Sequence, residues 1–179
     1  MAAVMKKITV FCLFLTGLSA LLWKITQAGF WLSLTIAAGT AEYHFLMRLG
    51  IGSLFSRLPG SWRDHRKAWY RPRDFEPGLY RMLKVRRWKN RLPTYDSQAF
   101  DLRLHSLEEI VAETCQAEVI HEVIALFSFL PLFAIPWLGA PWVFCITSLI
   151  AAGFDLTFVI LQRYNRPRLL RVLNRKSRP

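Results

Sequence analysis

The sequence predicts an all-α membrane protein with about four transmembrane helices and a cytoplasmic interfacial layer between the second and the third. Two observations carry this prediction. Apolar residues make up 53% of the 179 residues, and yet the chain holds 24 Lys and Arg against 12 Asp and Glu. These values conflict in a soluble domain, whose apolar residues are spread along amphipathic elements. They agree if long apolar runs alternate with charged segments, as in membrane proteins.

Two long apolar blocks supply the predicted helices. The first, 8–47, contains as charged or chargeable side chains only Lys24, Glu42 and His44, and the second, 119–162, contains no Lys or Arg. A helix needs about 20 residues to cross the hydrocarbon core, so each block is long enough for two. Pro131 is expected to kink the third helix. The predicted helices cover 8–23, 28–47, 118–135 and 140–162.

The distribution of Lys and Arg predicts the orientation. There are two before the first helix, one between the first two, fourteen in 48–117, none between the last two and seven from residue 163 onward. Because cytoplasmic segments are rich in Lys and Arg, both termini and segment 48–117 are expected in the cytoplasm. The chain is predicted to form one membrane domain, 1–179, with a basic tail at 163–179.

Segment 48–117 mixes aromatic side chains with arginines, which predicts a folded layer lying on the membrane surface. Within it, Ser106 and Glu109 have the spacing of a capping box, so a helix is expected to begin there and to continue into the third transmembrane helix.

Several functional classes fit the sequence poorly. A net charge of +12 suits nucleic acid, but apolar runs of this length do not, whereas basic residues beside a membrane are expected to face anionic lipid headgroups. The three cysteines, Cys12, Cys115 and Cys145, lack the spacing of metal ligands. The fingerprints of phosphate-binding loops, serine hydrolases, zinc proteases and nucleotide cofactors are also absent from the sequence. We therefore expect no metal, no bound cofactor and no nucleic-acid partner.

Ionisable residues gather near the predicted cytoplasmic ends of the helices, where such groups are candidates for function. Glu118 and His121 are three residues apart, so they share a helix face and the carboxylate could orient the imidazole as a base. The alternative is the polar first turn of a membrane helix. Glu42, His44 and Asp155 are expected in the same layer.

Two basic clusters are candidates for anion binding. In 162–168, Arg163, Arg166 and Arg168 surround Asn165, and arginines bind phosphate or carboxylate with two hydrogen bonds. The alternative is an anchor to lipid headgroups. The cluster Arg87, Trp88 and Lys89 is ordinarily a membrane-surface patch. These residues and the polar layer are the candidate site.

Three sequence blocks together resemble a known family. They are FEPGLYRMLKVRRWKNRLP (75–93), ETCQAEVIH (113–121) and QRYNRPRL (162–169). Their order and spacing resemble the glycosyl-4,4'-diaponeurosporenoate acyltransferase family of bacterial membrane proteins. The resemblance covers roughly the last 110 residues, and QRYNRPRL is its most specific part.

This resemblance implies transfer of a fatty acyl chain to a sugar hydroxyl of a glycosylated carotenoid or lipid, in the bacterial cell membrane. Joined to the residues, it gives a hypothesis in which His121, oriented by Glu118 or Glu113, takes the proton of the hydroxyl. The arginines at 163, 166 and 168, with Arg87 and Lys89, would hold the anionic head of an acyl-CoA or another acyl thioester.

Two alternatives stay open. The first is a non-catalytic membrane scaffold or lipid-binding subunit, for which we expect the C-terminal arginines to be splayed into solvent. The second is a small membrane methyltransferase or reductase. The sequence specifies neither the acyl acceptor nor the oligomeric state.

Overall fold

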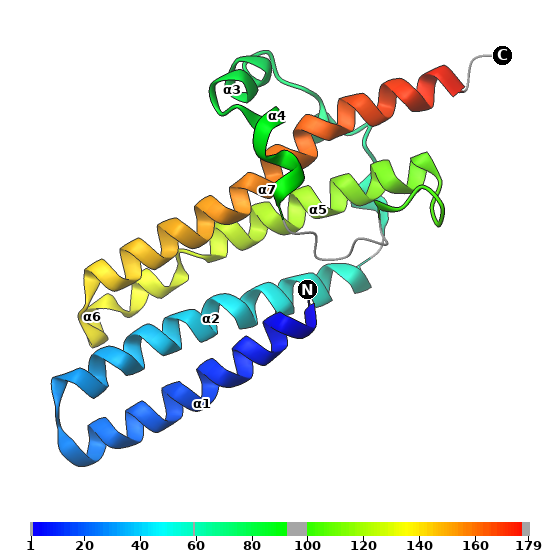
Figure 1. The fold of residues 1–179 in the computed structure, drawn as a ribbon. Helices are drawn as coiled ribbons and strands as arrows, with labels where there is room; N and C mark the ends of the chain where they lie inside the picture. Colours follow the sequence, from blue (N-terminus) through cyan, green and yellow to red (C-terminus); the bar gives the residue numbers. More distant parts are fainter. Residues whose placement is uncertain (1, 59, 93–99, 177–179) are drawn as a thin grey trace. The chain divides into compact units, whose positions relative to one another are not determined.

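The computed structural model describes residues 2–58, 60–92 and 100–176, and these residues form helices and connecting segments with no strand among them (Figure 1). The long helices are α1 (Ala2–Thr26), α2 (Gly29–Arg57), α5 (Leu107–Phe127) and α7 (Pro141–Lys176). The all-α class is therefore confirmed for the described part of the chain. The chain divides into two compact units, Met1–Ser56 with Val123–Asp155, and Arg57–Glu122 with Leu156–Pro179.

In the first unit, α1 and α2 form the predicted helical hairpin. The turn between them is tight, and Gln27 adopts a left-handed backbone with a φ of 54°. The Thr35 hydroxyl donates to Ser19 Oγ at 2.9 Å, which joins the two helices. At Gly39 an added Cβ would lie 3.5 Å from Thr16 Cγ2, so the helices approach closely at that point. α1 extends beyond its predicted range, 8–23, at both ends, and α2 extends beyond its predicted range, 28–47, at its C-terminal end.

Pro131 has a stronger effect than the predicted kink. The α-helix ends at Phe127, and a 3-10 helix, η5 (Leu130–Ala134), and the short α6 (Ile135–Leu138) follow. Proline has no N–H to donate to the carbonyl four residues earlier, which is that of Phe127. The Tyr43 hydroxyl donates to this carbonyl instead, at 2.8 Å. A side chain from α2 thus satisfies the acceptor that the proline leaves open.

The second unit contains the short helices of the segment predicted to lie on the membrane. They are η1 (Gly60–Arg63), η2 (Ala68–Tyr70), α3 (Glu76–Met82), α4 (Val85–Trp88) and η3 (Lys89–Arg91). The predicted capping box is confirmed at the start of α5, where the Glu109 N–H donates to Ser106 Oγ at 3.2 Å and the Ser106 N–H donates to Glu109 Oε2 at 2.7 Å.

Three helical segments are long and apolar enough to cross a membrane: Ala3–Thr26, Leu107–Leu138 and Pro141–Arg175. The chain is therefore a membrane protein with three candidate spans among its described residues. α2 is long enough, but Glu42, His44 and Arg48 interrupt its apolar sequence. The predicted fourth span, 28–47, thus rests on the length of α2 and its hairpin with α1.

Candidate functional site

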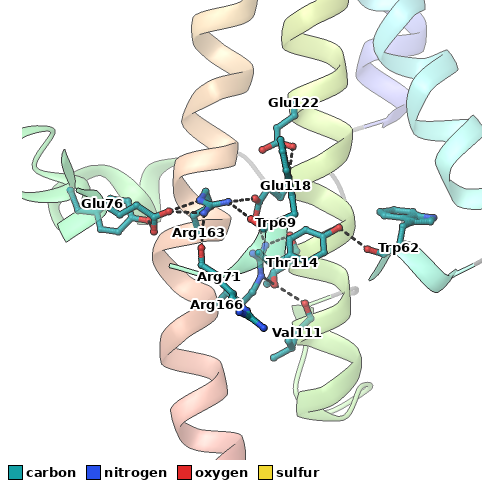
Figure 2. A network of polar contacts seen from close by, with 12 residues as sticks. Trp62, Trp69, Arg71, Glu76, Val111, Thr114, Glu118, Glu122, Arg163 and Arg166 are labelled. Atoms are coloured by element: carbon teal, nitrogen blue, oxygen red, sulfur yellow. Dashed lines mark hydrogen bonds and ion pairs between the residues drawn. The ribbon is translucent and has the colours of Figure 1, made fainter. Parts of the chain in front are cut away.

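A buried ion cluster lies in the second unit, and Glu118 is its centre. Glu118 of α5 is fully buried, and both of its carboxylate oxygens accept hydrogen bonds from arginines of α7 (Figure 2). Arg163 reaches Oε1 at 2.6 Å, and Arg166 reaches Oε2. A buried charge is tolerated only when it is paired and hydrogen-bonded. Each of these charges therefore depends on the others.

Arg163 connects Glu118 to the short helices. Its guanidinium lies 2.6 Å from Glu76 Oε1 of α3 and donates to the carbonyl oxygens of Trp69 at 3.1 Å and Arg71 at 3.0 Å. Glu76 is itself buried, at 4% exposure. One side chain of α7 thus fixes α3 and the loop after η2 against α5.

Arg166 is the most deeply buried cation of the cluster, at 2% exposure. It donates to Thr114 Oγ1 and to the Thr114 carbonyl, each at 3.0 Å, and its guanidinium lies 4.8 Å from the centre of the Tyr70 ring. Two carboxylates, those of Glu76 and Glu118, balance two guanidinium groups here. The formal charges of the cluster therefore cancel, and residues of α3, η2, α5 and α7 hold it in place.

Two tyrosines next to the cluster are strongly perturbed. Tyr70 donates to the Trp62 carbonyl at 2.6 Å, and burial, reinforced by nearby acidic groups that include Glu118, raises its pKa to about 12. Burial also raises the pKa of Tyr80, and the hydrogen bond that its hydroxyl donates to Glu76 at 2.8 Å adds to this effect. Both phenols therefore stay neutral and donate hydrogen bonds at physiological pH.

His121 lies one turn beyond Glu118 on α5. Its ring stacks on Phe158 of α7, with the ring centres 4.5 Å apart and the planes 10° from parallel. This stacking fixes the plane of a half-buried imidazole. Both Glu118 oxygens accept hydrogen bonds from arginines. The role of Glu118 as the group that orients His121 stays a prediction.

The neighbouring acids have other partners. Glu122 accepts a hydrogen bond from Trp69 Nε1 at 3.0 Å, and Glu113 forms an ion pair with Arg63 at 3.1 Å. Glu113 keeps 30% of its side chain exposed. Its predicted role beside His121 is untested.

The second unit also contains an open pocket of about 820 Å³ formed by α3, α4 and the C-terminal part of α7, which we name the basic groove. Its lining residues are Pro72, Glu76, Pro77, Tyr80, Arg81, Lys84, Arg86, Arg87, Tyr164, Pro167, Arg168 and Arg171. The predicted anion-binding residues therefore divide. Arg87 and Arg168 line the groove, whereas Arg163 and Arg166 pair with carboxylates in the buried cluster.

The remaining predicted binding residues lie close to the groove. Lys89 Nζ is 5.7 Å from the centre of the Tyr164 ring, on which the Arg168 guanidinium also lies, at 3.5 Å. The Trp88 indole donates to the Leu83 carbonyl at 2.8 Å and so secures the end of α3. Asn165 is half-buried on α7.

The first unit holds the predicted secondary polar residues. Asp155 of α7 is 1% exposed and pairs with Arg48 of α2, which also donates to the carbonyl oxygens of His44 and Ala151. His44 is buried one turn before Arg48. Glu42 is half-buried and lies two residues before His44, so the two side chains point to different faces of α2. Within the described residues, no group of three or more His, Cys, Asp or Glu is arranged to hold a metal ion.

Comparison with known sequences decides the family. The family model described as glycosyl-4,4'-diaponeurosporenoate acyltransferase matches residues 66–175, which is more than half of the chain. The chain belongs to this family. The resemblance carried by the three sequence blocks is thereby confirmed, and the family name indicates an acyltransferase rather than a methyltransferase or reductase.

Curated members of the acyltransferase family match over most of their length. The proteins named glycosyl-4,4'-diaponeurosporenoate acyltransferase from Staphylococcus aureus strains Newman and MRSA252 are 29% and 28% identical over 150 residues, which cover 75% of this chain and 88% of theirs. No solved structure matches the chain.

The three family blocks meet in the ion cluster of this acyltransferase. Block 75–93 supplies Glu76, block 113–121 supplies Thr114 and Glu118, and block 162–169 supplies Arg163 and Arg166. Pro93, the last residue of the first block, lies outside the described residues.

Sequence reasoning missed Glu76 and Thr114. The groove residues Arg81, Lys84, Arg86 and Arg171 are not among the predicted binding residues. One signal for Glu76 was available, because it is the one acid of a 19-residue block that carries six Lys and Arg. An isolated acid among so many cations indicates an internal ion pair.

Proposed function

We propose that this chain transfers a fatty acyl chain from an acyl thioester to a hydroxyl of a glycosylated carotenoid or lipid. The curated relatives are named for a glycosylated carotenoid acid, and a sugar offers hydroxyl groups as acyl acceptors. The observation that carries the proposal is the meeting of all three family blocks in one buried cluster one turn from His121. Packing of the helices alone would not require two buried carboxylates and two buried arginines.

In the proposed reaction His121 is the general base. It accepts the proton of the sugar hydroxyl while that oxygen attacks the thioester carbonyl, the carbon–sulfur bond breaks, and the proton passes to the departing thiolate. The stacked Phe158 supports this role, because it holds the imidazole plane while leaving the ring half-exposed. Glu118 and Glu113 are the candidates for orienting the ring, and the ion cluster would keep the backbone of α5 in place.

The membrane arrangement belongs to the same proposal. α2 would be a fourth span, both termini and segment 48–117 would be cytoplasmic, and the short helices would lie at the inner surface of the bacterial cell membrane. The distribution of Lys and Arg supports this orientation. Membrane lipids, the acyl donor and the acceptor are the proposed partners, and a lipid-soluble acceptor would reach the site from the bilayer.

The scaffold alternative is less well supported. Arginines that serve only as a lipid anchor are expected to extend into solvent, whereas Arg163 and Arg166 have 13% and 2% of their side chains exposed. Burial removes the hydration of the two guanidinium groups and takes them away from the lipid headgroups that an anchor would bind.

The test of the mechanism is an acyl-transfer assay on membranes that carry His121→Ala. Loss of a general base is expected to lower the rate about 10²- to 10⁴-fold at equal protein level. His105→Ala is the matched control, because His105 lies in the same unit outside the cluster, is 39% exposed and is expected to leave the rate unchanged. Undiminished turnover of His121→Ala would remove His121 from the mechanism.

The acceptor is identified by comparing lipid extracts of cells with and without the gene by mass spectrometry. We expect a glycosylated pigment or lipid that gains the mass of one fatty acyl chain when the gene is present. Identical extracts, with the protein present in the membrane, would favour the scaffold.

A further inference from the structure

The basic groove carries more positive charge than the structure neutralises. Six of its lining residues are cations: Arg81, Lys84, Arg86, Arg87, Arg168 and Arg171. The single acid in the lining is Glu76, and its carboxylate is used by Arg163 at 2.6 Å and by the Tyr80 hydroxyl at 2.8 Å. The groove is therefore a concave surface of strongly positive potential, which concentrates anions.

Part of the groove is held rigid in advance of any ligand. The Tyr164 ring meets Tyr80 edge to face at 5.2 Å, and it supports the Arg168 guanidinium at 3.5 Å. Arg168 also donates to the Tyr164 carbonyl, so both the ring and the backbone of Tyr164 hold its guanidinium in place. Cations that are already in position lose less entropy when an anion binds.

The backbone of the groove contains one unusual residue. Lys84 has φ 51° and ψ 39°, the left-handed conformation, between α3 and α4. Glycine or asparagine usually occupies such a position, because other side chains are strained there. The left-handed backbone of Lys84 is thus a strained position within the lining of the groove.

The size of the groove points to the kind of anion. Pockets for small molecules and cofactors measure about 300–1,000 Å³, and the basic groove, at about 820 Å³, falls in that range. A single phosphodiester headgroup is matched by one or two cations. Six cations around one concavity suit a ligand with several phosphates, since each bidentate arginine can hold one phosphate group.

We propose that the basic groove binds the phosphate-bearing head of the acyl donor, which has the chemistry of coenzyme A: a diphosphate and a further phosphate joined to a pantetheine thioester. This inference rests on the proposed acyl transfer, narrows the donor from any acyl thioester to one with the chemistry of coenzyme A, and assigns its binding site to the groove. Arg81, Lys84, Arg86 and Arg171 join Arg87 and Arg168 as donor-binding residues. Arg163 and Arg166 serve the buried cluster instead of the ligand.

The experiment measures binding of free coenzyme A to the purified full-length protein in nanodiscs of phosphatidylcholine, by isothermal titration. The groove variant is Arg86→Ser with Arg87→Ser. The matched control is Arg66→Ser with Lys67→Ser, an adjacent exposed basic pair of the same unit that does not line the groove. Thermal unfolding of both variants verifies that they fold.

We expect coenzyme A to bind in a salt-dependent manner and pantetheine, which has no phosphate, to bind far more weakly. The groove variant should lose about tenfold or more in affinity, since it removes two charged hydrogen-bond donors. The control pair should keep the affinity of the unaltered protein. Equal affinities of the groove variant and the unaltered protein would overturn the proposal.

A second arm repeats the titration in nanodiscs that contain phosphatidylglycerol. Affinity close to that in phosphatidylcholine is expected if the groove selects a phosphorylated donor, whereas complete displacement of coenzyme A by the anionic lipid would overturn the proposal in favour of a headgroup site. Acyl transfer from another donor, with no binding of coenzyme A, would overturn the groove and leave the proposed function intact. Binding of coenzyme A without any acyl transfer would support the groove as a binding site and overturn the proposed function.

Discussion

Tyr70 shows how the ion cluster depends on single side chains. Its hydroxyl is fixed by the Trp62 carbonyl, its ring faces the Arg166 guanidinium at 4.8 Å, and only 6% of the residue is exposed. Burial raises its pKa to about 12 because a buried phenolate would lose its hydration. The neutral form of Tyr70 is therefore part of the folded structure.

This shift predicts a loss of stability at alkaline pH. Because the pKa of Tyr70 is higher in the folded state than its ordinary value of about 10, the folded state holds the proton more tightly. The contribution is complete below about pH 10 and is lost as the pH rises through about 12. Tyr70→Phe, which cannot ionise and keeps the ring on Arg166, should reduce the fall in the melting temperature over this interval.

At neutral pH the same variant should be slightly less stable, by about 1 kcal/mol, because the Trp62 carbonyl loses its hydrogen bond. Melting curves of both proteins in one detergent between pH 8 and about pH 12 provide the measurement. Parallel curves over the whole interval would show that another group causes the alkaline transition.

The sequence predicted the members of the cluster better than their partners. Glu118 is predicted because an ionisable residue in a membrane helix is unusual, and Arg163 and Arg166 because three arginines within six residues favour anion binding. Their pairing was not predictable, since Glu118 and Arg163 are 45 residues apart and the register between α5 and α7 depends on packing. Of the arginines predicted to bind a ligand, Arg163 and Arg166 therefore lie in the buried cluster, and Arg87 and Arg168 line the groove.

Element boundaries were predictable where a local rule decides them. The capping box at Ser106 and Glu109 depends on residues three apart, and it is formed as expected. The end of α5 was not predictable from Pro131 alone, because proline can kink a helix or end it. Here Tyr43, 84 residues away, supplies the hydrogen bond that makes an ending possible.

The connection between α3 and α4 gives a test at the same scale. Lys84 is left-handed, so Lys84→Gly should relieve strain of about 1 kcal/mol, partly offset by the greater freedom of glycine in the unfolded chain. Its melting temperature is expected to stay the same or rise. The matched variant Arg81→Gly, inside α3, should lower stability by about 1 kcal/mol.

Both variants remove one cation of the groove, so the charge change is the same and the backbone effect alone differs. Thermal unfolding in the same detergent gives the comparison. Equal losses of stability would mean that no strain is stored at Lys84.

At the scale of the whole molecule, three spans follow from hydropathy alone, and α2 is where the sequence gives an ambiguous answer. Mean hydropathy treats Arg48 and His44 as unpaired polar residues. In the first unit, however, Arg48 pairs with the buried Asp155 of α7, and a paired charge is far less costly in a membrane than an isolated one. With 29 residues, α2 is also about 44 Å long, more than the roughly 30 Å that a span requires.

The number of spans determines where the two termini lie. Four spans place both ends of the chain on one side of the membrane, and three place them on opposite sides. We expect green fluorescent protein to fluoresce when fused to either end and alkaline phosphatase to be inactive at both, since each end carries the Lys and Arg typical of the cytoplasmic side. Phosphatase inserted at Gly139, between α6 and α7, is the positive control and should be active. Phosphatase activity at one terminus would contradict the span by α2. The two ends of the chain would then lie on opposite sides of the membrane.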